Sequence, residues 1–365
     1  MANLSDLFSF LKSSQGGSYL GVDIGTTSIK IAEIEKGKAA PRLVNYGILE
    51  TQSALLRANT ALQTSTLKLF DKETVQFLKA LVAQVKPKTK NVVASLPLFS
   101  AFTTVLTLPE MKEEELAQAV NFQARQYIPQ AISEVALDWS KVGEFEEDNG
   151  QKQFQILLIS VPQEQIKKYQ RIFEEAGLSL KALEVESLSI MRSVIGNDPT
   201  PTIVVDIGSL STDIMVVDQG QLKFSGQTDF SGSSLTQALA TSLNINPLRA
   251  EELKKERGIM GTGPNYELST IMLPFLDAII SEVRRAEFTY KNQFPLAKPV
   301  ERMIISGGGA NLLGIEKYFK DQFNMPVVRA TPLSKFEYPP ILEPLAQELN
   351  SLLAVSLGLG LKNFK

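Results

Sequence analysis

The sequence predicts an α/β protein of two domains, each opening with a strand hairpin that turns at the same acidic motif. The chain has 365 residues, more than one hydrophobic core usually serves. The segment YLGVDIGTTSIK at 19–30 returns as TIVVDIGSLSTD at 202–213. Each copy gives an apolar run suited to a buried strand, then Asp-Ile-Gly and small hydroxyl residues. The two acids are 206 − 23 = 183 residues apart, about one domain length.

Composition narrows the chemistry that the chain can perform. With 44% hydrophobic and 21% charged residues the chain is typical of a globular protein, and a net charge of −3 argues against nucleic acid as a partner. The chain has no Cys and no His, which excludes disulfides, thiolate nucleophiles, His triads and the usual zinc sites. Without a signal peptide or a long apolar run, we expect a cytoplasmic protein.

The first domain is predicted from residues 19–95 and 181–200, preceded by an N-terminal amphipathic segment at residues 1–18. Leu4, Leu7, Phe8 and Leu11 give that segment its apolar helical face. After the hairpin, alternating apolar residues predict a strand at 43–49. Helical periodicity runs over 72–85 until Pro87 stops it, and strands follow at 91–96 and 178–185. A helix at 186–194 and a Pro-rich joint at 196–201 complete this domain.

Residues 96–180 have their own pattern and predict a small inserted α+β subdomain. Alternation favours strands at 102–108, 135–145 and 154–161, and helical spacing favours helices at 112–127 and 163–176. The acidic segment 143–150 is typical of a solvated hairpin tip. Two hairpin-like pairings among these strands, with two helices, are sufficient for such a unit.

Residues 201–365 predict the second domain, with a helical subdomain at about 231–295. Strands are expected at 214–217 and 221–226, and Ser233 or Ser234 is expected to cap a helix that continues through Leu243. Helical spacing returns at 247–257 and 266–293. A strand at 302–306, a glycine-rich turn at 307–314, a helix to residue 323 and a strand at 327–328 follow.

The two acidic turns have the residues of a phosphate and magnesium site. Glycine lets backbone N–H groups approach an anion, and hydroxyl side chains add donors. Asp23 and Asp206 cannot donate, so we expect them to hold a hydrated magnesium ion. One Asp-x-Gly after a strand is usually an ordinary β-turn, but its repetition one domain later favours a functional pair. The candidate phosphate ligands are Gly25, Thr26, Thr27, Ser28, Gly208, Ser209, Ser211 and Thr212.

Two further groups of residues are candidates for the sugar and base of a nucleotide. The turn that contains Gly307, Gly308, Gly309 and Ala310 leaves backbone open to a ligand, although such turns also arise where a helix packs closely on a sheet. Glu251 and Lys254 are three residues apart and therefore share a helical face. They could reach the adenosine end or form a surface pair.

The order of these parts resembles the superfamily of actin, hexokinase and the heat-shock ATPases. Within it, the insertion after the strand 91–96 resembles the extra subdomain of the FtsA and PilM families, and PilM in particular is similar at residues 21–34, 250–255, 282–293 and 305–312. The resemblance implies an actin-like, ribonuclease H-like, two-domain ATPase fold that binds ATP and Mg²⁺. It implies that Lys30 joins Thr26 to Ser28 at the terminal phosphates and that Gly208 to Thr212 hold the other side. Gly232-Ser233 replaces a pair of glycines, which argues against a third phosphate contact.

The resemblance to the PilM family also implies a role. Such proteins are cytoplasmic members of the type IV pilus assembly machinery that bind the N-terminal cytoplasmic tail of PilN beside the insertion. This chain would then reach the inner membrane, and other inner-membrane pilus proteins, through partners. Asp213 is a weak candidate for a general base, so we expect slow ATPase activity at most. A carbohydrate kinase and an FtsA-like filament protein are the alternatives, and a homo-oligomer is open.

Overall fold

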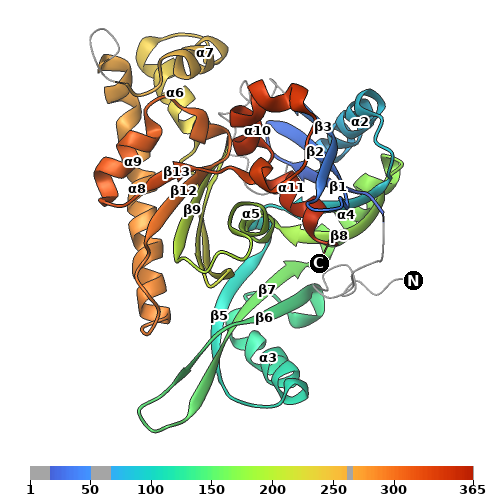
Figure 1. Ribbon diagram of the computed structural model, residues 1–365, viewed down its shortest axis with the longest axis vertical. Helices are drawn as coiled ribbons and strands as arrows, with labels where there is room; N and C mark the ends of the chain where they lie inside the picture. Colours follow the sequence, from blue (N-terminus) through green and yellow to red (C-terminus); the bar gives the residue numbers. More distant parts are fainter. Residues whose placement is uncertain (1–16, 51–66, 261–265, 365) are drawn as a thin grey trace.

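The structure is a computed structural model that describes residues 17–50, 67–260 and 266–364. The predicted amphipathic helical pattern of the N-terminal segment lies outside these residues. The described chain contains two five-stranded sheets and one three-stranded sheet (Figure 1). Within the described ranges, no helix is both long enough and apolar enough to cross a membrane.

The first sheet has the strand order β3-β2-β1-β4-β8. Strand β1 is antiparallel to β2 and parallel to β4, and β4 is parallel to β8. Helix α2 contacts β3, and α4 contacts both α2 and β8. The bounds are β1 Tyr19–Ile24, β2 Ser28–Glu35, β3 Arg42–Glu50, α2 Leu67–Val85, β4 Asn91–Leu96, α4 Gln163–Glu175 and β8 Ser179–Val185.

The second sheet repeats this arrangement with the order β11-β10-β9-β12-β13. Its central strand β9 is antiparallel to β10 and parallel to β12, as β1 is to β2 and β4. The similarity of the two turns therefore extends to the whole sheet. The bounds are β9 Thr202–Ile207, β10 Thr212–Asp218, β11 Gln221–Thr228, α6 Gly232–Leu243, α7 Pro247–Arg257, α8 Tyr266–Gln293, β12 Arg302–Ser306, α9 Ile315–Phe323 and β13 Val327–Arg329.

Two local details differ from the predictions. The N-cap of α6 is Ser231, not Ser233 or Ser234, because the chain is still extended at Ser231 and becomes helical at Gly232. The Ser234 hydroxyl instead accepts a hydrogen bond from the Ser231 backbone N–H at 3.1 Å. The helix expected at 186–194 is divided into α5, Glu186–Ile190, and a π-helical turn, η4, Met191–Ile195.

The insertion forms a sheet with the order β5-β7-β6 that packs on both faces (Figure 1). One face meets α3 in a core of its own, which includes Leu116 and Val120 of α3 and Ile156 and Leu158 of β7. Residues of the opposite face, such as Leu157, join the main core. The bounds are η2 Leu98–Ser100, β5 Phe102–Pro109, α3 Glu113–Tyr127, β6 Val135–Glu146 and β7 Lys152–Pro162.

The C-terminal segment returns from the second sheet to the first. It comprises η7 Pro332–Lys335, η8 Pro340–Leu345, α10 Ala346–Leu352 and α11 Ala354–Leu361. Helix α11 packs on β1 and α5. A Cβ at Gly21 would lie 2.0 Å from the Ser356 carbonyl oxygen, so glycine is required at this contact. The sequence placed residues 201–365 together, but the contacts of α11 lie with the first sheet.

Candidate functional site

The two acidic turns have the same geometry. The Gly25 N–H donates to the Ser28 carbonyl at 2.9 Å, and the Gly208 N–H donates to the Ser211 carbonyl at 2.9 Å. Asp23 is paired across its hairpin with Lys30, whereas Asp206 is paired with Asp213. The equivalence therefore ends at this position, where one turn carries a cation and the other an acid.

A serine on the neighbouring parallel strand stands beside each acid. The Ser95 hydroxyl donates to Asp23 Oδ1 at 3.0 Å, and Ser306 lies opposite Asp206 in the β9 and β12 register. Both serines are fully buried. The repeat thus includes the support behind each acid as well as the turn itself.

The predicted magnesium ligands Asp23 and Asp206 both lie close enough to Lys30 for their charges to change its pKa. Lys30 Nζ is 3.3 Å from Asp23 Oδ2. Burial would lower the pKa of Lys30, but the negative charges of Asp23 and Asp206 outweigh it and raise that pKa. Burial raises the pKa of Asp206 to about 6, while Lys30 opposes this rise. The charges of both turns therefore act on one partly buried lysine, whose side chain is 18% exposed.

The site also contains an acid that the sequence analysis missed, Glu186. It begins α5 directly after β8 ends. Burial, and then the charges of Asp213 and Asp23, raise its pKa well above the ordinary range. Ligands of open α/β sheets bind beyond the carboxyl ends of strands. An acid directly after the predicted strand 178–185 was the available signal.

Asp213, the weak candidate for a general base, lies in the same cluster. Burial and the charge of Asp206 raise its pKa to about 8. Within the described ranges, both of its carboxylate oxygens are buried and make no hydrogen bond of ordinary geometry. Such buried acids favour a ligand that brings positive charge.

A hydrated magnesium ion fits this group of acids better than a metal held by protein alone. Among the described residues, no three His, Cys, Asp or Glu side chains converge to enclose an ion. Magnesium retains most of its waters and needs only one or two carboxylates plus phosphates. Because the Asp23 carboxylate already contacts Lys30 and Ser95, its contact with an ion would pass through water.

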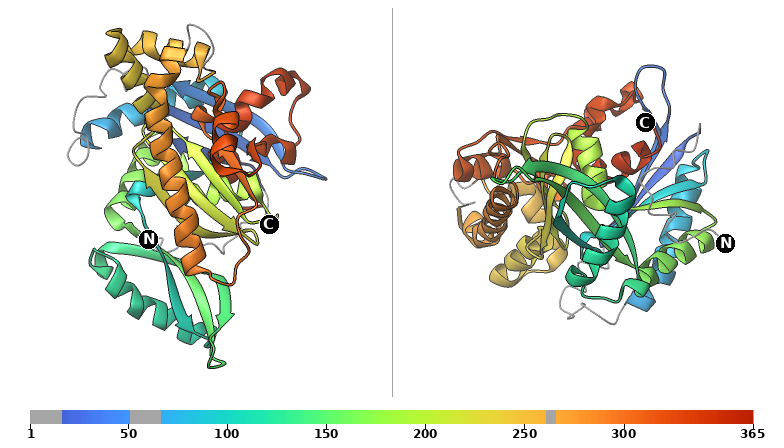
Figure 2. Two further views of the ribbon diagram at one scale, coloured as in Figure 1. Left: turned by 90° about the vertical axis from the view of Figure 1, so that its left-hand side faces the viewer. Right: turned by 90° about the horizontal axis from the view of Figure 1, so that it is seen from below.

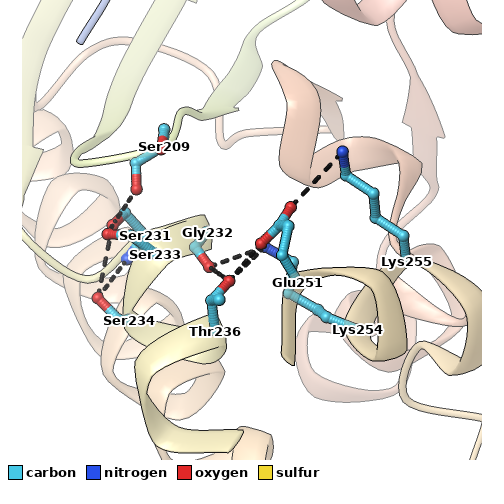
Figure 3. A network of polar contacts seen from close by, with 9 residues as sticks. All are labelled: Ser209, Ser231, Gly232, Ser233, Ser234, Thr236, Glu251, Lys254 and Lys255. Carbon is cyan, nitrogen blue, oxygen red and sulfur yellow. Dashed lines mark hydrogen bonds and ion pairs between the residues drawn. The ribbon is translucent and has the colours of Figure 1, made fainter. Parts of the chain in front are cut away.

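The second turn is held from behind by the start of α6 (Figure 3). The Gly232 N–H donates to the Gly208 carbonyl at 3.0 Å, and the Ser233 N–H donates to the Ser209 carbonyl at 2.8 Å. The Ser231 hydroxyl donates to the same Ser209 carbonyl at 2.8 Å. The first donors of this helix therefore hold the turn in place.

Glu251 and Lys254 form an ion pair that braces α7 against α6. Lys254 Nζ lies 2.6 Å from Glu251 Oε2 and donates to the Gly232 carbonyl at 2.9 Å (Figure 3). Thr236 bonds to both side chains. Burial lowers the pKa of Lys254. The side chains are 18% and 11% exposed, so they are not the surface pair that the sequence left open, and their contact with adenosine remains a prediction.

The triple glycine lies at the carboxyl end of β12, where η6, Gly308–Asn311, packs against β9. Gly307 has φ 78°, and a Cβ there would lie 2.5 Å from the Ile207 carbonyl oxygen. A Cβ at Gly309 would lie 2.3 Å from Ile207 Cγ2. At Gly308 the nearest atom, Leu352 Cδ2, is 3.7 Å away. Packing therefore explains two of the glycines and leaves room for a side chain at Gly308, so its contact with a ligand stays a prediction.

Alanine substitutions separate these two roles. Gly309→Ala should destabilise the protein by about 1–3 kcal/mol because the core must shift, as measured by urea unfolding. Gly308→Ala should leave stability unchanged and weaken nucleotide binding by about tenfold, a loss of about 1.4 kcal/mol, as measured by titration with labelled ATP. Unchanged affinity in folded Gly308→Ala protein would argue against backbone approach at this turn.

Known proteins resemble this chain over nearly its whole length. A family model described as type IV pilus assembly protein PilM matches residues 21–364. The cell division protein FtsA of Enterococcus faecalis is 24% identical over 357 residues, covering 87% of this chain and 79% of the relative. FtsA of Enterococcus hirae is 23% identical and covers 87% of this chain and 78% of that relative.

Solved structures show the same architecture. A chain of the PilM-PilN type IV pilus biogenesis complex matches with a TM-score of 0.79 and 23% identity, over 97% of this chain and 100% of that one. MreB5 of Spiroplasma citri bound to ADP matches with a TM-score of 0.53 and 14% identity, over 93% of this chain and 94% of that one. The fold is therefore actin-like, as the sequence predicted.

Proposed function

Because the chain belongs to the PilM family of type IV pilus assembly proteins, we propose that it is an ATP-binding scaffold or switch of a pilus assembly machinery. The observation that carries this proposal is the pair of equivalent acidic turns, one from each sheet, whose acids Asp23 and Asp206 both raise the pKa of the partly buried Lys30. A ligand held by two domains stabilises the arrangement that it binds best.

In this proposal ATP lies between the two turns with a magnesium ion that neutralises its phosphates. Asp206 would hold the hydrated ion, and Asp23 would contact its water. Lys30 and the hydroxyls of Thr26 to Ser28 would contact the terminal phosphates, opposite Gly208 to Thr212. Gly308 would pass close to the sugar. The buried carboxylate oxygens of Asp213, which make no hydrogen bond of ordinary geometry, support a cation here.

Slow ATP hydrolysis is the proposed activity. Glu186 and Asp213 are the two acids of the site that could exchange a proton with the attacking water. Glu186 is in a better position to orient water, because it begins α5 at the end of the first sheet, opposite the second turn. Glu186→Gln should lower ATP turnover by about a hundredfold, the usual size of one acid–base contribution, and leave ATP affinity within about threefold. Phosphate release under saturating ATP measures this. Glu175→Gln, on the exposed side of α4, is the control, and unchanged turnover in Glu186→Gln would assign the role elsewhere.

The proposed partner is the cytoplasmic N-terminal tail of PilN, with the chain at the inner membrane through that contact. The support is the similarity to a chain of the PilM-PilN complex over 97% of this sequence, together with an insertion that has its own core. The same proposal includes a groove for this tail beside the insertion, contacts with other inner-membrane pilus proteins, and assembly into a homo-oligomer.

Capture of a PilN tail peptide, with a scrambled peptide as control, tests the partner, and titration with labelled ATP in Mg²⁺ tests the site. We expect saturable uptake of ATP and capture of the native peptide alone. Uptake without capture would reject the pilus role. Rapid sugar-dependent ADP release would then indicate a carbohydrate kinase, and pelleting with ATP and lipid vesicles an FtsA-like filament protein. No uptake would reject the nucleotide site itself.

A further inference from the structure

The insertion is attached to the second domain by a buried lysine. Lys223 of β11 is 5% exposed. Its Nζ donates to the Val142 carbonyl of β6, lies 3.3 Å from Gln221 Oε1 and stands 5.1 Å from the centre of the Phe294 ring. Of the insertion's three strands, β5 and β6 both contact β11.

The insertion is shaped to receive this lysine. The pairing of β6 with β7 shifts between Lys141 and Gly143, so Val142 has no partner residue across the ladder. A bulge of this kind leaves a backbone group available to another donor, and here Lys223 takes the carbonyl. The lysine and the bulge therefore match each other across the boundary between the two units.

A second contact lies beside the first. Gln155 of β7 donates from Nε2 to the carbonyl of Gln293, the last residue of α8, at 2.7 Å. A Cβ at Gly143 would lie 2.3 Å from Gln155 Oε1, so the glycine makes room for this side chain. Figure 2 shows α8 running along the second domain down to the insertion. Lys223 of the second domain and Gln155 of the insertion thus fix the boundary between these two units from both sides.

The opposite end of β11 is connected to the second acidic turn. After β11 ends at Thr228, the chain passes through Phe230, whose carbonyl accepts a hydrogen bond from the Thr212 hydroxyl at 2.7 Å. It then enters α6, whose first N–H groups hold the Gly208 and Ser209 carbonyls. One strand of eight residues therefore joins the turn to Lys223.

We propose that the contacts of Lys223 and Gln155 couple the orientation of the insertion to the nucleotide bound at the second turn. This inference rests on the proposed function. The insertion leaves and re-enters the first sheet through β4 and β8, yet these two side chains fix it to the second domain. Any change in the angle between the domains must therefore tilt the insertion or break the contacts. Packed interfaces convert small shifts at a ligand site into such movements.

Spin labels can measure this coupling, because the chain has no native cysteine. Asp148→Cys at the tip of the β6 and β7 hairpin and Lys79→Cys on α2 are both exposed, and report the distance from the insertion to the first domain. Adding Mg-ATP should shift this distance distribution in the otherwise native chain. In the variant Lys223→Met with Gln155→Leu, we expect the shifted population to fall by at least about fivefold, the lower limit of typical coupling between sites.

Lys152→Met is the matched control, since Lys152 is exposed on the same hairpin, and it should retain the full shift. Titration of every variant with labelled ATP separates the proposed nucleotide site from the proposed coupling, because absent uptake rejects the nucleotide site. Uptake with no shift in the native chain overturns the inference, as does an equal shift in the double variant. If the double variant does not fold, Gln155→Leu alone is measured, and a full shift there overturns the inference too.

Discussion

Replacing Asp206 with asparagine is expected to weaken magnesium-dependent ATP binding strongly and at the same time to stabilise the empty protein. The carboxylate lies beside Asp23 and Asp213, and burial raises its pKa to about 6. Charged at neutral pH, it lowers the stability of the empty fold, because the folded state holds its proton more tightly than the unfolded chain does. This contribution to stability falls as pH rises from about 4 to 6. Asparagine keeps the size and removes the charge.

The expected loss of Mg-ATP affinity is about a hundredfold, in the upper range for disrupted metal sites. The expected gain in the free energy of unfolding is about 1–2 kcal/mol at pH 7.5, from a shift of roughly two pKa units partly offset by relaxation. ATP titration in Mg²⁺ and in EDTA, with urea unfolding of the empty protein, gives both values. Asp321→Asn, exposed on α9, should change neither. Lower stability with intact affinity would give Asp206 a purely structural role.

The second large effect is expected at Glu184, whose side chain is 1% exposed between two cations. Both of its oxygens lie 2.6 Å from the guanidinium of Arg192, and Lys362 Nζ is 3.4 Å away. Glu184→Ala should lower the free energy of unfolding by about 3–5 kcal/mol, because removing one partner leaves buried charge uncompensated. Urea unfolding at pH 7 measures the loss, and Glu174→Ala on the exposed side of α4 should cost much less.

Acid unfolding gives an independent measure of the same group. Burial would raise the pKa of Glu184, but the charges of Arg192 and Lys362 outweigh it and hold that pKa at about 2. The ordinary value of 4.5 applies in the unfolded chain, so the stabilisation is complete above about 4.5 and is lost as pH falls towards 2. Glu184→Ala should lack this part of the acid dependence. The same acid dependence in native and variant protein would contradict the assignment.

The sequence was sufficient to predict the fold and the acidic turns because these depend on local signals. The repeated Asp-Ile-Gly motif marks both β1 and β9, and periodicity located the strands and helices of the insertion. Glu186 was missed because its place directly after a predicted strand, the only local signal, does not show that this strand end lies near Asp213. The brace between Lys254 and Gly232 likewise depends on the packing of α7 against α6.

The C-terminal helix was missed for a different reason. Its sequence, AVSLGLGL at 354–361, is apolar on all sides and carries two glycines, which disfavour helix by about 1 kcal/mol each. Tertiary packing outweighs this preference: a Cβ at Gly358 would lie 1.9 Å from the Ser189 carbonyl oxygen. Only a helix without side chains at such points can lie so close to α5.

The return of the C-terminal segment means that the polypeptide passes between its two halves at 196–201 and again after β13, since Glu337 already pairs with Arg42 of β3. Both passages lie together, since Lys335 donates to the Val194 carbonyl at 2.9 Å and Ser193 to the Ala354 carbonyl at 2.7 Å. Two neighbouring covalent links form a hinge, which permits rotation about one line and resists other displacements. We therefore expect any opening of the molecule to be a rotation about the line through these two links.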